Sequence, residues 1–225
     1  MCGRFTLRIS HTNLQRFFQL KDSVVDLSPR YNIAPTQTIL AIVRGSNDRS
    51  RRTVRMIWGL VPPWSDDVRI GARMINARAE TVDEKPSFKQ PLKHNRCLIP
   101  ADGYYEWKKV SDGKQPFLMH RPDEGPFAFA GLWQRNRKAS GDGGEIVTCT
   151  VITTNANQRT EDVHDRMPVI LDVDDYDQWL DPDFSDSETL KGLLRPAPEE
   201  LLVVTAVDRE VNNARNDNAK CVEPV

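Results

Sequence analysis

The stretch RCLIPADGYYEWKKVSDGKQPFLMH, residues 96–120, decides the class of fold. Apolar and aromatic residues are frequent at 96–99 and 104–110, as is typical of β-strands. The sequence Ser111-Asp112-Gly113-Lys114 then predicts a turn that leads into another strand at 116–120. Because strands joined by so short a turn pair antiparallel, the stretch predicts a hairpin.

Further strands are predicted on both sides of this hairpin, where short apolar and β-branched runs alternate with turn-forming residues. These runs lie at 38–44, 53–58, 127–133, 145–154, 167–171 and 201–207. A chain of 225 residues is long enough to bury one large core. We therefore expect a single α+β domain spanning 1–225, mainly antiparallel β in barrel-like sheets, with short flanking helices.

Three short helices are expected around these strands. The first has Asn13 as its N-cap and an apolar face, and the other two cover 174–180 and 188–194. Three segments without periodicity are predicted to be loops, namely 31–36, 45–52 and 59–73.

Composition excludes several classes of protein. No apolar run reaches the roughly 18 to 20 residues of a membrane span, and the N-terminus lacks a secretory signal pattern. The four cysteines are far apart without a CxxC pair, and the four histidines are also scattered. This spacing argues against a disulfide framework and against a metal site. We expect a cytoplasmic protein that needs no metal or cofactor.

Charge is distributed unevenly along the chain. Residues 1–110 contain 19 Lys and Arg against 10 Asp and Glu, whereas the remainder contains 12 against 22. The segment 172–188 alone carries eight acidic residues and no basic one. Surface solvation is the simpler explanation of such charges, but the basic half is also suited to a polyanion.

Cys2 directly follows Met1, and methionine is normally removed when the next side chain is this small. Cys2 would then carry both a free α-amine, with an ordinary pKa of about 7.7 to 8, and a thiol with one of about 8.5. An amine condenses with an aldehyde to an imine, and a neighbouring thiol then closes a thiazolidine ring. On position alone, an inert cysteine at a frayed terminus is the simpler interpretation.

A series of short motifs, in the expected order along nearly the whole chain, resembles the SOS-response-associated peptidase family. The motifs are Cys2-Gly3-Arg4-Phe5, Tyr31-Asn32-Ile33-Ala34-Pro35-Thr36, Trp58-Gly59-Leu60, Ile75-Asn76-Ala77-Arg78-Ala79-Glu80, Asp102-Gly103-Tyr104-Tyr105-Glu106-Trp107, Thr153, His164-Asp165-Arg166-Met167-Pro168-Val169, and Val211-Asn212-Asn213 with Asn216-Asp217. The resemblance implies a monomer, nucleoid-associated if its source is bacterial, that acts in the response to DNA damage. It implies single-stranded DNA containing abasic sites as the partner, and covalent capture of the lesion through Cys2.

The resemblance assigns catalysis to Cys2, Asn76, Glu106 and His164. Glu106 precedes a tryptophan in a predicted strand, and a buried carboxyl with a raised pKa is suited to moving protons. Asn76 is a neutral donor and acceptor that can orient the amine or the sugar. His164 can protonate the sugar oxygen as the ring opens. The structural alternatives are an exposed strand Glu, a turn Asn and a surface ion pair between Asp165 and Arg166.

Five residues are predicted to contact DNA: Arg4, Asn32, Trp64, Arg78 and Thr153. Guanidinium groups suit phosphates, and an aromatic ring in a Pro-rich loop can stack on a base. The family can carry two adjacent aromatics in this loop, whereas Ser65 follows Trp64 here.

Two other functions stay open. One is a cysteine peptidase or N-terminal-nucleophile hydrolase, in which His164 activates the Cys2 thiol against an amide. The other is a noncovalent reader of damaged DNA, which needs Arg4, Arg78 and Trp64 but no free amine on Cys2.

Overall fold

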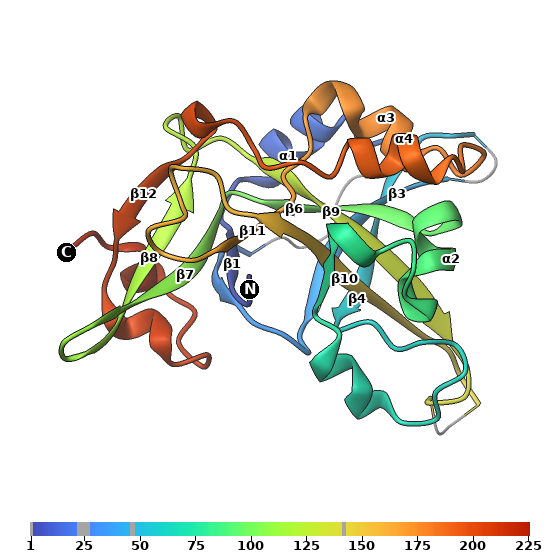
Figure 1. Ribbon diagram of the computed structural model, residues 1–225, viewed down its shortest axis with the longest axis horizontal. Helices are drawn as coiled ribbons and strands as arrows, with labels where there is room; N and C mark the ends of the chain where they lie inside the picture. Colours follow the sequence, from blue (N-terminus) through green and yellow to red (C-terminus); the bar gives the residue numbers. More distant parts are fainter. Residues whose placement is uncertain (1, 22–27, 46–47, 141–142) are drawn as a thin grey trace.

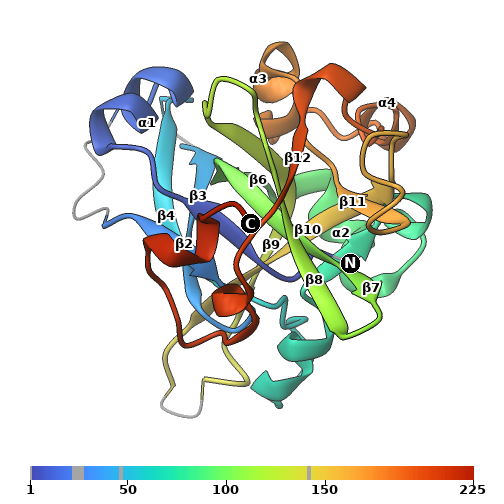
Figure 2. The same cartoon turned by 90° about the vertical axis from the view of Figure 1, so that its left-hand side faces the viewer.

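The predicted central hairpin is present. The computed structural model describes residues 2–21, 28–45, 48–140 and 143–225. In it β7 (Gly103–Val110) pairs antiparallel with β8 (Gly113–His120). This hairpin belongs to a five-stranded sheet in the order β12-β8-β7-β1-β2, with β1 at Phe5–Leu7, β2 at Arg30–Ile33 and β12 at Val203–Ala206. In Figure 2, β8 and β12 lie in front of the rest of the protein.

The second sheet closes on itself. It contains β3 (Thr38–Arg44), β4 (Arg51–Trp58), β6 (Arg96–Ala101), β9 (Phe127–Asn136) and β10 (Ile146–Asn155). The strands follow the order β10-β4-β3-β6-β9, and β9 pairs with β10 again, so these strands form a closed barrel. The prediction of a mainly antiparallel, barrel-like α+β domain is therefore confirmed.

β10 also organises two short strands at its far end. β5 (Asn76–Arg78) runs parallel to it, with Asn76 opposite Val151, while β11 (Arg166–Pro168) runs antiparallel, with Arg166 opposite Asn155. Backbone pairing to one strand thus brings together segments that lie about 90 positions apart in the sequence. Both short strands lead directly into residues of the candidate site.

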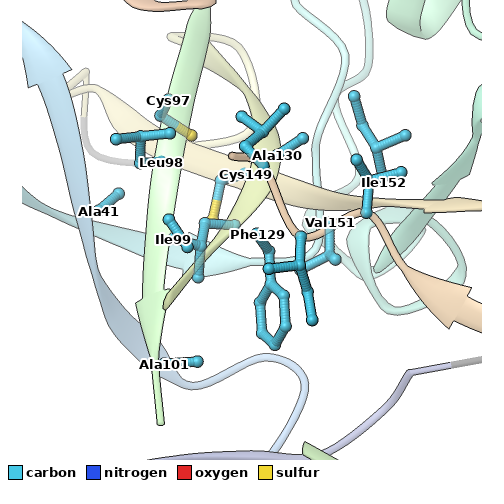
Figure 3. Close-up of a cluster of buried hydrophobic side chains, with 14 of the residues drawn as sticks. Ala41, Cys97, Leu98, Ile99, Ala101, Phe129, Ala130, Cys149, Val151 and Ile152 are labelled. Carbon is cyan, nitrogen blue, oxygen red and sulfur yellow. The ribbon is translucent and has the colours of Figure 1, made fainter. Parts of the chain in front are cut away.

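The interior of the barrel is filled by small and branched side chains. Figure 3 shows buried residues of β3, β6, β9 and β10, all of them 0% exposed: Ala41, Cys97, Leu98, Ile99, Ala101, Phe129, Ala130, Cys149, Val151 and Ile152. Successive side chains of a strand point to opposite faces, and both faces of these strands are buried, which is why they show short apolar runs in the sequence. The barrel is therefore a packed core.

Helices cover the ends of the sheets (Figure 1). They are α1 (His11–Phe18), α2 (Pro86–His94), α3 (Tyr176–Leu180) and α4 (Ser187–Gly192). Among the described residues, no helix is long and apolar enough to cross a membrane.

Several local predictions need correction. The N-cap of α1 is Ser10, whose hydroxyl accepts from the Asn13 N–H, so Asn13 itself lies inside the helix. The predicted loop at 31–36 begins as strand β2, because its residues pair with β1. Helix α2 was missed because Pro86 and Pro91 lie within it; Pro86 occupies the first turn, where a missing N–H costs little.

The predicted loop 59–73 is also more ordered than its composition indicates. It ends in a 3₁₀-helix, η1 (Val68–Arg73), and its first residues are buried. Gly59 has φ +135° and packs so closely on Gly71 that an added Cβ would lie 2.6 Å from the Gly71 carbonyl oxygen. Part of the predicted 45–52 hairpin loop lies outside the described residues.

One buried carboxylate anchors strand β1. Asp102 is 1% exposed and accepts hydrogen bonds from the backbone N–H groups of Arg8 and Ile9, the Thr6 hydroxyl and the Arg8 side chain. The Asp102 N–H in turn donates to the Thr6 carbonyl at 3.0 Å. This anchor holds β1 against β7 and so fixes where the N-terminus of the chain lies.

We expect Asp102→Ala to lower the free energy of unfolding by about 3 to 5 kcal/mol, because it leaves several buried donors without an acceptor. Denaturant unfolding of both proteins measures this loss. Asp112→Ala, which removes a fully exposed carboxylate paired with Arg209, is the control and should leave the midpoint unchanged. Equal midpoints for Asp102→Ala and the unmodified protein would contradict the anchoring role.

Candidate functional site

Cys2 is held in a fixed position beside β5. It is 0% exposed, and its carbonyl oxygen accepts a hydrogen bond from Asn76 Nδ2 at 2.9 Å. Among the described residues, the buried Asn76 Oδ1 has no hydrogen-bond partner. Asn76 therefore orients the Cys2 backbone with one end of its amide and keeps an acceptor for another group. Cys2 is not a frayed terminus.

Glu106 is buried next to Cys2. Its side chain extends from β7 and the residue is 3% exposed, as predicted from its position before Trp107. Burial raises the pKa of Glu106 to about 7. Burial also raises the pKa of the Cys2 thiol, and the charge of Glu106 raises it further. Near neutral pH the carboxyl can accept or donate a proton, while the thiol stays protonated.

His164 faces Glu106 across the site, with His164 Nε2 at 4.0 Å from Glu106 Oε2. His164 Nδ1 lies 3.0 Å from both the Arg166 backbone nitrogen and the Asp165 Oδ1. Burial lowers the pKa of His164, and the exposed Asp165 partly offsets this effect. The lowered pKa favours the neutral ring, whose Nε2 faces Glu106.

Arg166 holds the segment that carries His164. Its guanidinium donates to both carboxylate oxygens of Glu80, at 2.6 and 2.9 Å, and to the Thr153 carbonyl at 2.8 Å. The ion pair of Arg166 is thus with Glu80, not with its neighbour Asp165 as the structural alternative supposed. Neither Glu80 nor Arg166 was predicted to be a site residue, although both lie inside motifs of the family.

Arg4 is fixed on the other side of the site. Its Nη1 donates to Asn32 Oδ1 and to the Val211 carbonyl, each at 2.8 Å, and its guanidinium lies 5.8 Å from the centre of the Trp107 ring. Asn32 Nδ2 donates to the carbonyls of Val211, Asn213 and Asn216. The C-terminal segment is therefore fastened to β2, where it forms one wall of the site.

Some of these groups line one open cleft. Its wall consists of Arg4, Glu106, Trp107, Lys114, His164 and Asn212. The lining thus combines two cationic side chains with a carboxyl and an imidazole. A polyanionic ligand with an electrophilic carbon near Glu106 matches this arrangement.

The predicted DNA contacts fall into two groups. Trp64 is 54% exposed and Arg78 is exposed, so both can reach a ligand. Asn32 and Thr153 are 0% exposed, and the Thr153 hydroxyl donates to the Ala77 carbonyl. These two side chains are enclosed: Asn32 accepts a hydrogen bond from Arg4, and Thr153 on β10 pairs with Arg78 on β5.

The loop that carries Trp64 is clamped from β9. Asn136 is 1% exposed, and its Nδ2 donates to the carbonyls of Pro62 and Ser65 on either side of Trp64, at 2.6 and 2.9 Å. The exposed indole is thus presented on a rigid loop, which favours a role in contacting a ligand over one in the core.

No cluster of three or more His, Cys, Asp or Glu residues suited to a metal ion occurs in the part of the chain that the structure describes. The site chemistry that its residues support is that of an amine, a thiol, a carboxyl and an imidazole.

Most of the chain matches one protein family. The family model "SOS response associated peptidase (SRAP)" matches residues 1–214, and the chain belongs to this family. It is 41% identical to the abasic site processing protein YoqW and 42% identical to YoaM, both of Bacillus subtilis; each alignment covers 99% of this chain, and 99% and 98% of those proteins. A crystal structure from Bacteroides thetaiotaomicron, 26% identical, superposes with a TM-score of 0.86 over the full length of both chains.

Replacing the buried carboxyl tests the raised pKa of Glu106. A raised pKa means that ionisation costs the folded protein more than the unfolded chain, so the stability of the protein relative to Glu106→Gln falls as pH rises from about 4.5 to about 7. Over this pH range, we expect the free energy of unfolding of Glu106→Gln to rise by up to about 3 kcal/mol relative to that of the unmodified protein. Denaturant unfolding of both proteins between pH 4 and 8 measures the difference; a difference independent of pH would contradict it.

Proposed function

We propose that this protein, acting as a monomer, captures abasic sites in single-stranded DNA by a covalent bond to Cys2 and so shields the lesion during DNA repair. The observation that carries the proposal is the position of Cys2, which Asn76 holds by its carbonyl next to Glu106. Glu106 and His164 line an open cleft whose wall also contains Arg4 and Lys114. The names of the relatives, abasic site processing proteins, support the same substrate.

Hydrolysis of the Met1–Cys2 peptide bond precedes the crosslinking reaction, releases methionine and gives Cys2 a free α-amine. When the abasic sugar opens, its O4′ gains a proton, its C1′ hydroxyl loses one, and C1′ becomes an aldehyde. The amine adds to C1′ and the resulting carbinolamine loses water to form an imine. The thiol sulfur then bonds to C1′ while the thiol proton passes to nitrogen, which gives a thiazolidine. Water is the only molecule released.

Each residue of the site has a role in these steps. Glu106, with a pKa of about 7, takes the proton from the attacking amine and returns one to the departing hydroxyl. His164 protonates the sugar oxygen as the ring opens. The Oδ1 of Asn76, which has no hydrogen-bond partner among the described residues, orients the amine. Arg4, Arg78 and Trp64 hold the phosphates and a base beside the lesion.

The peptidase alternative fits this geometry less well. A cysteine peptidase needs a thiolate, which a partner with positive charge stabilises. Here burial and the Glu106 carboxylate both raise the pKa of the Cys2 thiol, and His164 Nε2 faces Glu106. A neutral thiol suits addition to an imine that has already formed, so an amine-first reaction is favoured.

Incubation with a single-stranded oligonucleotide that carries one abasic site tests the proposal. Intact mass is expected to show loss of Met1 and then a denaturation-resistant adduct whose mass reflects loss of one water. Cys2→Ala should give no thiazolidine. Cys2→Ser should give at most an imine that borohydride traps and hydrolysis removes. Cys221→Ala, which removes a sulfur elsewhere, is the control and should crosslink normally.

The other two functions give different outcomes. If the protein with a free amine forms no adduct, and blocking the amine leaves its affinity for the oligonucleotide unchanged, the protein is a noncovalent reader. Release of peptide fragments that depends on Cys2, without an adduct, indicates a hydrolase. Either result rejects covalent capture.

Glu106 should control the rate of crosslinking. We expect Glu106→Gln to slow adduct formation by about 100-fold or more, since general acid–base catalysis contributes roughly that much. The rate of the unmodified protein should change with an inflection near pH 7 that the variant lacks. Quenched time courses across pH 5.5 to 8.5 measure both; an inflection that persists in Glu106→Gln assigns it to another group.

A further inference from the structure

The cleft extends beyond the reactive residues along the β7–β8 hairpin. Past Glu106 and His164 it is lined by Trp107, Lys114 and Asn212. These three residues have no part in the chemistry described above, and none was among the predicted DNA contacts. The position of this end of the cleft, directly continuous with the site, indicates that a ligand reaching Cys2 also passes here.

The indole of Trp107 is held rigidly at this end. Its Nε1–H donates to Asn212 Oδ1 at 2.6 Å, and the Arg4 guanidinium covers the ring at 5.8 Å from its centre. Because Asn212 Oδ1 accepts this bond, the amide Nδ2 points away from the indole, and it donates to no other described residue. Asn212 thus offers two N–H donors at the rim of the cleft.

β7 extends past its pairing with β1 at the same place. β1 pairs with β7 at Gly103 and Tyr104, and the last bond of this ladder runs from the Tyr105 N–H to the Arg4 carbonyl. In an antiparallel ladder every second residue directs its N–H to the same edge. The Trp107 N–H therefore points to the same edge of β7 as the Tyr105 N–H, on the side of Arg4.

Positive charge is concentrated on the hairpin itself. Lys114 and Lys109 are exposed and directly opposite each other across β7 and β8. Like charges in this position destabilise a sheet, and a bound anion offsets the repulsion between the two lysines. Within the described part of the chain neither lysine makes an ion pair; the nearby Asp112 pairs with Arg209.

We propose that the β7–β8 hairpin, through Lys114, Asn212 and Trp107, binds the phosphodiester backbone on one side of the abasic site. This inference rests on the proposed function, because it takes the strand to pass Cys2. In Figure 1 the hairpin and the η1 segment after Trp64 lie on opposite sides of β1. The strand is thus held by Trp64 on one side of the lesion and by the hairpin on the other.

The test uses oligonucleotides with one tetrahydrofuran site, which has no aldehyde, flanked by nucleotides only on the 5′ side or only on the 3′ side. Fluorescence anisotropy gives Kd across salt concentrations. We expect Lys114→Gln to weaken binding severalfold for one of the two oligonucleotides only. For that one, the slope of log K against log salt should shrink by about 0.7, the value for one phosphate contact on a single strand.

Matched variants make the result specific. Lys89→Gln removes the same charge from the exposed face of α2 and should change neither oligonucleotide's Kd nor its slope. Asn212→Ala should weaken the same oligonucleotide as Lys114→Gln but leave the salt slope unchanged, because the amide is neutral. No effect of Lys114→Gln, or an equal effect on both oligonucleotides, overturns the proposal.

The covalent assay on a true abasic site separates this inference from the proposed function. If crosslinking fails while Lys114→Gln still shows the one-sided effect, the hairpin binds DNA and covalent capture is rejected. If crosslinking succeeds while Lys114→Gln has no effect, the hairpin proposal alone is rejected.

Discussion

The hydrogen bonds of Asp102 to strand β1 are the constraint on which the rest of the site depends. They fix a three-residue strand between β7 and β2, and this strand determines where Cys2 and Arg4 lie. A strand so close to the end of the chain frays unless it is tied down, and these bonds add to the burial of Phe5 and Leu7. Asn32 completes the arrangement by holding Arg4 and the C-terminal segment together. Both ends of the chain are thereby assembled around one cleft.

Burial then sets the chemistry of the residues that this framework brings together. One desolvated environment raises the pKa of Glu106 and of the Cys2 thiol, and lowers that of His164. Each shift favours the neutral form of its group at the pH of the cell. A site of neutral proton donors and acceptors is suited to imine chemistry, in which the amine must lose a proton and the carbinolamine must gain one.

The uneven distribution of charge along the sequence becomes a spatial separation in the fold. The acidic segment from Asp172 to Glu188 forms η3 (Val173–Asp175), α3 and the start of α4, whereas Lys109 and Lys114 lie on the β7–β8 hairpin. Figure 1 shows these two regions at opposite ends of the molecule. A polyanion approaching the cleft therefore meets positive charge near the site and is repelled elsewhere.

The sequence by itself determined the strand-rich class of fold and most strand positions, because short apolar runs and turn residues depend only on local order. It did not determine helix α2, the Ser10 cap, the closure of the barrel by β10, or the partners of Arg166 and Asn32. Those features arise from contacts between residues far apart in the chain. The sequence of a motif does not distinguish a buried asparagine from an exposed one. Only packing shows that Asn32 and Thr153 are enclosed while Trp64 and Arg78 are exposed.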